Sequence, residues 1–128
     1  MDTADKTHIL EQAKTMLENG QNEQARLLLL ALLKDDAENQ AALLILGGTY
    51  YCDGRLEDAE MVFERLVLLQ PGLGAVSIAL FNTLWKLGRQ QEALEEIKRF
   101  FSVADREKEK DTIMQYITIT QQLSGKAE

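Results

Sequence analysis

The sequence is poor in the residues that build metal centres, disulfides and chain breaks. Its 128 residues include one cysteine, one histidine and one proline. A lone cysteine, Cys52, cannot form an internal disulfide, and no Cys or His pair has the spacing of a metal site. We therefore expect a reducing, cytoplasmic setting, no metal and no cofactor.

Positive charge is also scarce. There are 14 Lys and Arg residues against 21 Asp and Glu residues, so the formal net charge is −7. An acidic surface repels nucleic-acid phosphates and anionic lipid headgroups, and we expect neither as a partner. The longest apolar run, residues 27–33, is too short to cross a bilayer. Residues 1–6 lack the basic and apolar regions of a secretory signal, so we expect none.

Little in the sequence predicts catalysis. No pattern orients a serine or cysteine nucleophile toward His8, and Gly47-Gly48 lies inside a helical pattern rather than after a strand. Acidic residues gather near expected helix starts, where negative charge is favourable, so the cluster of Glu92, Glu95 and Glu96 is interpreted as a solvated face. We expect no catalytic residue and no enzymatic activity.

Three segments of the chain repeat at one fixed spacing. The glycines at 20, 54 and 88 and the alanines at 25, 59 and 93 both advance in steps of 34 residues. Apolar residues follow each alanine at the same two offsets: Leu29, Phe63 and Ile97, then Leu32, Leu66 and Phe100.

Elementary helix geometry explains this spacing. The glycine adopts a left-handed conformation that ends one helix tightly, and the alanine then allows the next helix to approach closely. Large residues four and seven positions further on share one face and fill the space between the helices. One such hairpin cannot bury its own apolar face, so the pattern predicts stacked hairpins.

A 34-residue register with these positions resembles the tetratricopeptide repeat. We assign repeats to residues 6–39, 40–73 and 74–107, followed by a closing helix over 108–123. The second repeat matches the family's signature best; its matching residues are Leu46, Gly47, Tyr50, Gly54, Ala59, Phe63 and Pro71. The other repeats depart from it, with Ala13 and Phe81 in place of Gly47 and with Ala37 and Asp105 in place of Pro71.

The resemblance implies an all-α fold, an α-solenoid of stacked antiparallel helix hairpins forming a single domain over 1–128. We expect about seven helices, over 4–18, 22–35, 39–52, 56–69, 73–86, 90–103 and 107–123. Residues 116–120 are rich in β-branched side chains and taken alone could form a strand. The repeat architecture favours a helix there.

The resemblance also implies a partner-binding groove lined by the first helix of each hairpin. Leu17, Tyr51 and Trp85 share one repeat position and are expected to form a line along it. The alternative for Trp85 is packing beneath the closing helix. The expected groove residues are Leu10, Lys14, Leu17, Leu44, Gly48, Tyr51, Ile78, Asn82, Trp85, Lys86 and Tyr116.

This groove is mostly apolar and aromatic, which suits an amphipathic helix or a short extended segment of a partner protein. It has too few cations for the family's carboxylate-clamp variant. We therefore predict a protein-interaction module or adaptor. One alternative is a small bacterial chaperone similar to the tetratricopeptide chaperones of type III secretion. Another is a self-associating scaffold that forms a homodimer through the apolar residues 27–30.

Overall fold

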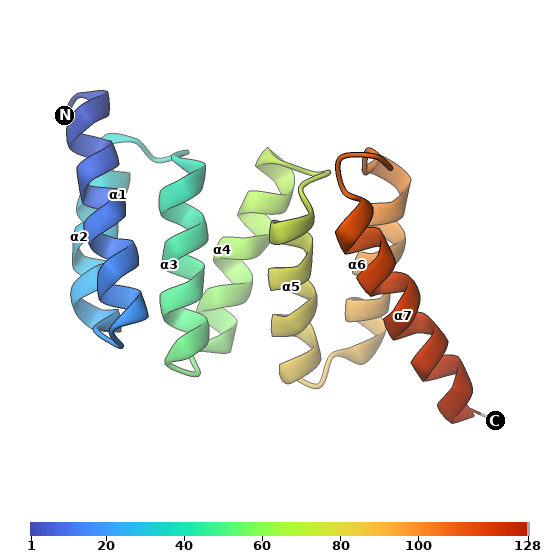
Figure 1. Cartoon of the computed structure of the whole chain (residues 1–128). Coiled ribbons are helices and arrows are strands. Elements are labelled where there is room, and N and C mark those ends of the chain that lie inside the picture. Colours follow the sequence, from blue (N-terminus) through green and yellow to red (C-terminus); the bar gives the residue numbers. More distant parts are fainter. Residues whose placement is uncertain (128) are drawn as a thin grey trace. The chain divides into compact units, whose positions relative to one another are not determined.

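The computed structural model describes residues 1–127, with side chains described as far as Gly125 (Figure 1). No β-strand occurs within residues 1–127, so the all-α prediction is confirmed, including a helix over 116–120. The described residues form seven α-helices: α1 (Thr3–Glu18), α2 (Asn22–Asp35), α3 (Gln40–Cys52), α4 (Leu56–Leu69), α5 (Gly74–Lys86), α6 (Gln90–Val103) and α7 (Lys110–Ala127).

The helix ends agree with the sequence prediction to within one residue except at the closing helix. Helix α7 begins at Lys110 rather than at 107 and extends to Ala127 rather than 123. The residues just before Lys110 form a turn instead. In this turn the Asp105 carboxylate accepts the N–H groups of Glu107 and Lys108 at 2.9 and 3.0 Å. These bonds lower the pKa of Asp105. They satisfy the backbone before the helix starts.

The repeated glycines close the three hairpins as expected. Gly20, Gly54 and Gly88 have φ values of 77°, 74° and 79°, the left-handed region that glycine enters without strain. After each glycine, the chain donates back into the last turn of the preceding helix, as Gln21 N–H does to the Met16 carbonyl at 2.8 Å. This is the glycine-based C-cap in which otherwise unpaired carbonyls gain a donor.

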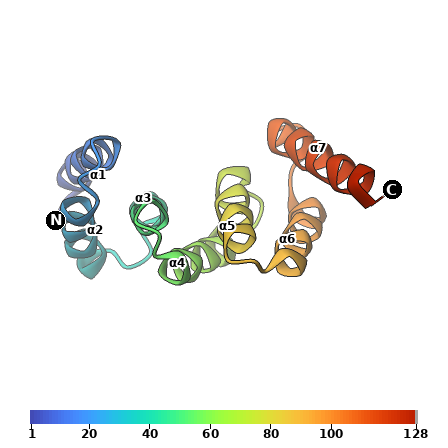
Figure 2. The same ribbon diagram turned by 90° about the horizontal axis from the view of Figure 1, so that it is seen from below.

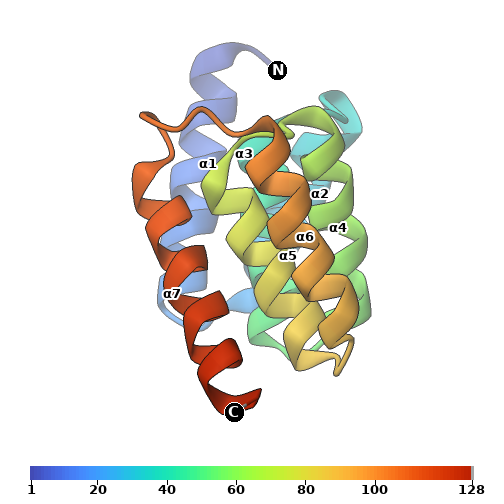
Figure 3. The same cartoon turned by 90° about the vertical axis from the view of Figure 1, so that its right-hand side faces the viewer.

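Contacts divide the chain into two compact units, Met1–Leu69 and the residues from Gln70 onward. In the first unit, α1 pairs with α2 and α3 with α4, while α3 also packs against α1 and α2 (Figure 2). In the second unit, α5 pairs with α6, and α7 contacts α5 (Figure 3). The division falls at the turn that follows α4, and the single-domain assignment stays a prediction.

The repeated alanines lie in the core, on the second helix of each hairpin. Ala25, Ala59 and Ala93 each have 0% of their surface exposed. The large residues that follow them at both repeat offsets are buried as well; their exposed fractions are 0% for Leu29, 3% for Phe63 and Ile97, 0% for Leu32, 1% for Leu66 and 0% for Phe100. The core predicted from the 34-residue spacing is therefore the observed core.

Neighbouring glycines in α3 have different surroundings. Gly47 is buried, and a methyl group placed on it would overlap the ring of Phe63. Gly48 is half-buried, and a methyl group there would meet only Leu17 Cδ2, at an ordinary contact distance of 3.4 Å. The glycine at 47 is thus required by packing, whereas the glycine at 48 keeps a surface position small.

This difference gives a matched pair of substitutions. We expect Gly47→Ala to lower the free energy of unfolding by about 1–3 kcal/mol, because the Phe63 ring must move out of a packed site. We expect Gly48→Ala to leave it unchanged or raise it by up to ~1 kcal/mol, because alanine is the better helix former. Urea denaturation of both variants measures the two values. Equal destabilisation would show that Phe63 does not lie over Gly47.

Candidate partner-binding faces

Two helices of the first unit place their expected groove residues side by side. Leu10, Lys14 and Leu17 follow one another at helical spacing on α1, as do Leu44, Gly48 and Tyr51 on α3. The two rows meet where Leu17 Cδ2 covers Gly48. Leu10 packs against the core of the unit, Lys14 is exposed, and the other members are half-buried. We call these six residues the α1–α3 face.

The neighbouring tyrosine, Tyr50, is held within the fold instead. The guanidinium carbons of Arg26 and Arg55 lie 5.3 and 4.7 Å from its ring centroid, close enough for cation–π attraction. Arg26 also pairs with Asp53 at 2.6 Å and donates to the Thr49 carbonyl at 3.2 Å. These contacts join α2 to the end of α3 and leave Tyr51 as the aromatic residue of the α1–α3 face.

Asp53 is the acceptor that fixes this end of α3. Asn22 donates its side-chain amide to Asp53 Oδ1 at 2.8 Å, while Arg26 occupies the other carboxylate oxygen. The bond from Asn22, and next that from Arg26, lowers the pKa of Asp53 below its ordinary value. The carboxylate is therefore held in the charged form that both donors favour.

In the second unit, the expected residues of α5 remain accessible in part. Asn82 and Lys86 are exposed, while Ile78 and Trp85 are half-buried. The Trp85 ring stacks on buried Phe81, with centroids 5.7 Å apart and planes at 21°. Trp85 thus packs one side of its ring on the core and keeps part of its surface exposed, and its place in a groove stays a prediction. We call these four residues the α5 face.

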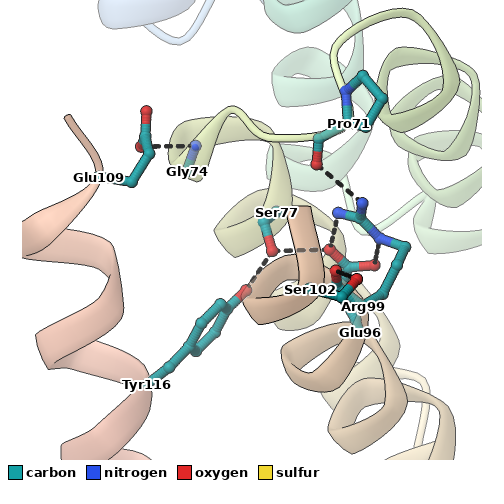
Figure 4. A network of polar contacts seen from close by, with 8 residues as sticks. All are labelled: Pro71, Gly74, Ser77, Glu96, Arg99, Ser102, Glu109 and Tyr116. Carbon is teal, nitrogen blue, oxygen red and sulfur yellow. Dashed lines mark hydrogen bonds and ion pairs between the residues drawn. The ribbon is translucent and has the colours of Figure 1, made fainter. Parts of the chain in front are cut away.

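The prediction that Tyr116 lines the groove is wrong. Its side chain has 0% exposed surface and packs edge-on against Phe81 and Phe100, with centroids 5.6 Å away in both cases. Its hydroxyl lies 2.6 Å from Ser77 Oγ (Figure 4). Burial raises the pKa of Tyr116, so the phenol stays protonated. The residue attaches α7 to α5 and is unavailable to a partner.

Tyr116 is the end of a buried polar network (Figure 4). Ser77 donates to Glu96 Oε2 at 2.7 Å, so its oxygen is left to accept the Tyr116 proton. Arg99 donates to both Glu96 oxygens at 2.7 and 2.6 Å, and to the Pro71 carbonyl at 2.8 Å. The bonds to Glu96 raise the pKa of Arg99. The buried carboxylate is therefore fully satisfied.

Glu96 also corrects the interpretation of the acidic cluster as a solvated face. Only 5% of Glu96 is exposed, whereas Glu92 and Glu95 are exposed. The sequence did contain a signal, because Glu96 shares the helical face of Ala93, Ile97 and Phe100, all of which are buried. A carboxylate on an otherwise apolar face indicates a buried partner.

The comparisons with known proteins agree with this architecture. Residues 10–73 match the model of the tetratricopeptide repeat family. The chain belongs to the tetratricopeptide repeat family. A search of curated proteins finds no match to the sequence.

A solved structure shares the fold of this tetratricopeptide repeat chain. It is the crystal structure of SycD, the type III secretion translocator chaperone of Yersinia enterocolitica, in an alternative dimer. The TM-score is 0.85, and the match covers 99% of this chain and 97% of SycD at 16% sequence identity. At this identity the likeness shows the common fold.

Among the described residues, no three or more His, Cys, Asp or Glu side chains are placed to hold a metal ion. No helix within that part of the chain has the length and apolarity of a membrane span. The lone cysteine, Cys52, is exposed at the end of α3.

The polar network leads to a test with two serines. Ser77→Ala removes the hydroxyl shared by Glu96 and Tyr116, and we expect a loss of about 1–3 kcal/mol in the free energy of unfolding, because both buried groups lose a partner. Ser102→Ala removes only an exposed bond to the Arg99 carbonyl, and we expect a change within ~0.5 kcal/mol. Chemical denaturation measures both, and similar values for the two variants would contradict the role given to Ser77.

Proposed function

We propose that this tetratricopeptide repeat protein is an interaction module that holds an apolar segment of a partner protein on the exposed faces of its first helices. The observation that carries the proposal is the α1–α3 face. Its rows of partly exposed apolar residues lie side by side, although the core of the unit is filled by other residues. No catalytic step is part of the proposal.

The chemistry of the α1–α3 face defines the segment that it would hold. Leu17, Leu44 and Tyr51 provide apolar contact area, while Gly48 leaves room between them. Lys14 supplies a cation at the edge. An amphipathic helix with apolar residues at positions i, i+3, i+4 and i+7 presents a matching stripe. Tyrosine is a frequent anchor in such interfaces because it buries a large area at small entropic cost.

The α5 face of the second unit offers a similar surface. Trp85 and Ile78 supply apolar area, and exposed Asn82 and Lys86 border it. The stack on Phe81 fixes the indole ring before a partner arrives, which lowers the entropic cost of binding. We propose that this face holds apolar residues of the same or another segment.

A chaperone for a secreted protein is the second candidate. It is favoured by the likeness to SycD, a translocator chaperone whose fold matches nearly the whole of both chains. A chaperone of this kind would use the same faces to shield an aggregation-prone amphipathic helix. The exposed thiol of Cys52 suits a reducing compartment, and we propose a cytoplasmic location.

Self-association is a further possibility that rests on α2. Leu27 and Leu30 are 66% and 45% exposed and lie on one side of the helix, so a second copy could cover them. We expect sedimentation to show a dimer that Leu27→Lys dissociates, because a buried lysine would lack a partner. A wild-type monomer at high concentration would remove this proposal and leave the interaction module intact.

The proposed function is tested by measuring binding and stability together. We expect Tyr51→Ala to weaken capture of the partner from a native lysate by about 2 kcal/mol, while the fold loses much less. Phe63→Ala is the core comparison, and we expect it to cost about 3–5 kcal/mol of stability. Met61→Ala is the surface control, because Met61 is 70% exposed on α4.

Two results would contradict the proposed function. In one, Tyr51→Ala unfolds the protein as readily as Phe63→Ala, which would make the tyrosine a core residue. In the other, Met61→Ala reduces capture of the partner as much as Tyr51→Ala does, which would place the partner on α4 instead of on the α1–α3 face.

A further inference from the structure

The second unit has a hollow that plays no part in the proposed function. It lies where the last turn of α6 meets the first turns of α7, and its volume is about 340 Å³. Its lining consists of Phe101, Arg106, Lys110, Ile113, Met114 and Ile117. None of these belongs to the α1–α3 face or the α5 face. We call it the α6–α7 hollow.

The apolar residues of this hollow are unusually exposed. The exposed fraction is 41% for Phe101, 54% for Met114 and 36% for Ile117, and neighbouring Val103 reaches 51%. Single exposed apolar residues are common on proteins, but a contiguous group around a concave site indicates an interaction surface. An occupant with an apolar side chain would remove this area from water.

The charges at the hollow oppose those of the whole molecule. The chain from Asp105 to Asp111 alternates in sign, and the fold uses two of its acidic residues elsewhere. Asp105 accepts N–H groups in the turn before α7, and Glu109 accepts the Gly74 N–H at 2.8 Å. The two cations Arg106 and Lys110 are thus left beside the apolar floor of an otherwise acidic protein.

Both cations are available to an incoming anion. Arg106 and Lys110 are exposed, and neither forms an ion pair with any residue in the described part of the chain. Glu107 is exposed next to Arg106, and Asp111 lies on the α7 surface beyond Lys110. An anion that approaches over Phe101 and Met114 therefore meets two positive groups at the lining itself.

The surface continues along α7. A second hollow of about 440 Å³ is lined by Asp111, Met114, Gln115, Thr118 and Ile119, so Met114 borders both. Two adjoining hollows along one helix fit an elongated occupant better than a single small molecule.

We infer that the α6–α7 hollow binds an acidic amphipathic segment of a partner protein. One or two apolar side chains of the segment fill the space between Phe101, Met114 and Ile117. Its carboxylates pair with Arg106 and Lys110, and this pairing selects acidic over basic segments by electrostatic complementarity. The site is separate from the α1–α3 and α5 faces, so it gives the chain a second attachment point.

The test uses two synthetic helical peptides with the same leucines at i, i+3, i+4 and i+7. One carries glutamates beside the leucines and the other carries lysines. Fluorescence anisotropy measures their affinity for the full chain. We expect the glutamate peptide to bind at least about tenfold more tightly than the lysine peptide, and the difference to shrink as salt is added.

Charge reversal then locates the site. We expect Arg106→Glu/Lys110→Glu to lower the affinity for the glutamate peptide about tenfold or more and to raise the affinity for the lysine peptide. The matched control is Lys34→Glu/Arg65→Glu, which changes net charge equally at exposed positions of the first unit. Ile117→Gln tests the apolar floor of the hollow. It should lower the affinity for both peptides, while the melting temperature of the protein stays near the wild-type value.

Several outcomes would overturn the inference. These are equal affinity for both peptides, no binding of either, and equal loss in the control variant. Binding of decanoate without binding of the glutamate peptide would assign the hollow to small amphiphiles. Self-association that charge reversal abolishes, without peptide binding, would assign it to a second copy. Tyr51→Ala should leave peptide affinity unchanged, so this test fails or succeeds independently of the α1–α3 face.

Discussion

The close approach of two antiparallel helices at one small residue is the constraint on which this structure depends. Ala25, Ala59 and Ala93 have no exposed surface, and each lies on the second helix of a closely paired hairpin. A left-handed glycine turn sets the register of each crossing. Once it is set, the large residues of each second helix point into the core, and the opposite rows of the first helices stay partly exposed. The faces proposed for binding are thus a consequence of the repeat.

Polar contacts join helices in addition to the apolar core of the repeat. In the first unit, the bonds of Arg26 to Asp53 and Thr49 tie one hairpin to the end of the next helix. In the second unit, the hydroxyl of Ser77 connects buried Glu96 with Tyr116 and so attaches the closing helix. Buried polar groups specify a single arrangement because any other leaves them without partners. In the second unit this network forms a specific junction where the regular repeats end and the closing helix begins.

The sequence allowed most of the fold to be predicted, and only part of the surface. The 34-residue spacing fixes helix ends and core residues, because each depends on neighbours within one hairpin. Tyr116 was placed in the groove because its position was carried over from the regular repeats, whereas the closing helix turns it onto Ser77. The α6–α7 hollow depends on how α7 follows α6 across a side-chain turn at Asp105, which no periodicity records. The residues of the α1–α3 and α5 faces remain predictions as binding residues.

A cross-linking measurement tests the proposed binding face most directly. The thiol of Cys52 is exposed at the end of α3, next to the α1–α3 face, and accepts a short photoactivatable maleimide. The comparison protein is Met61→Cys in a Cys52→Ser background, which moves the label to an exposed position on α4. We expect illumination in a native lysate to join the partner to the label at 52 and not to the label at 61. A partner joined through 61 and not through 52 would contradict a binding face on the first helices.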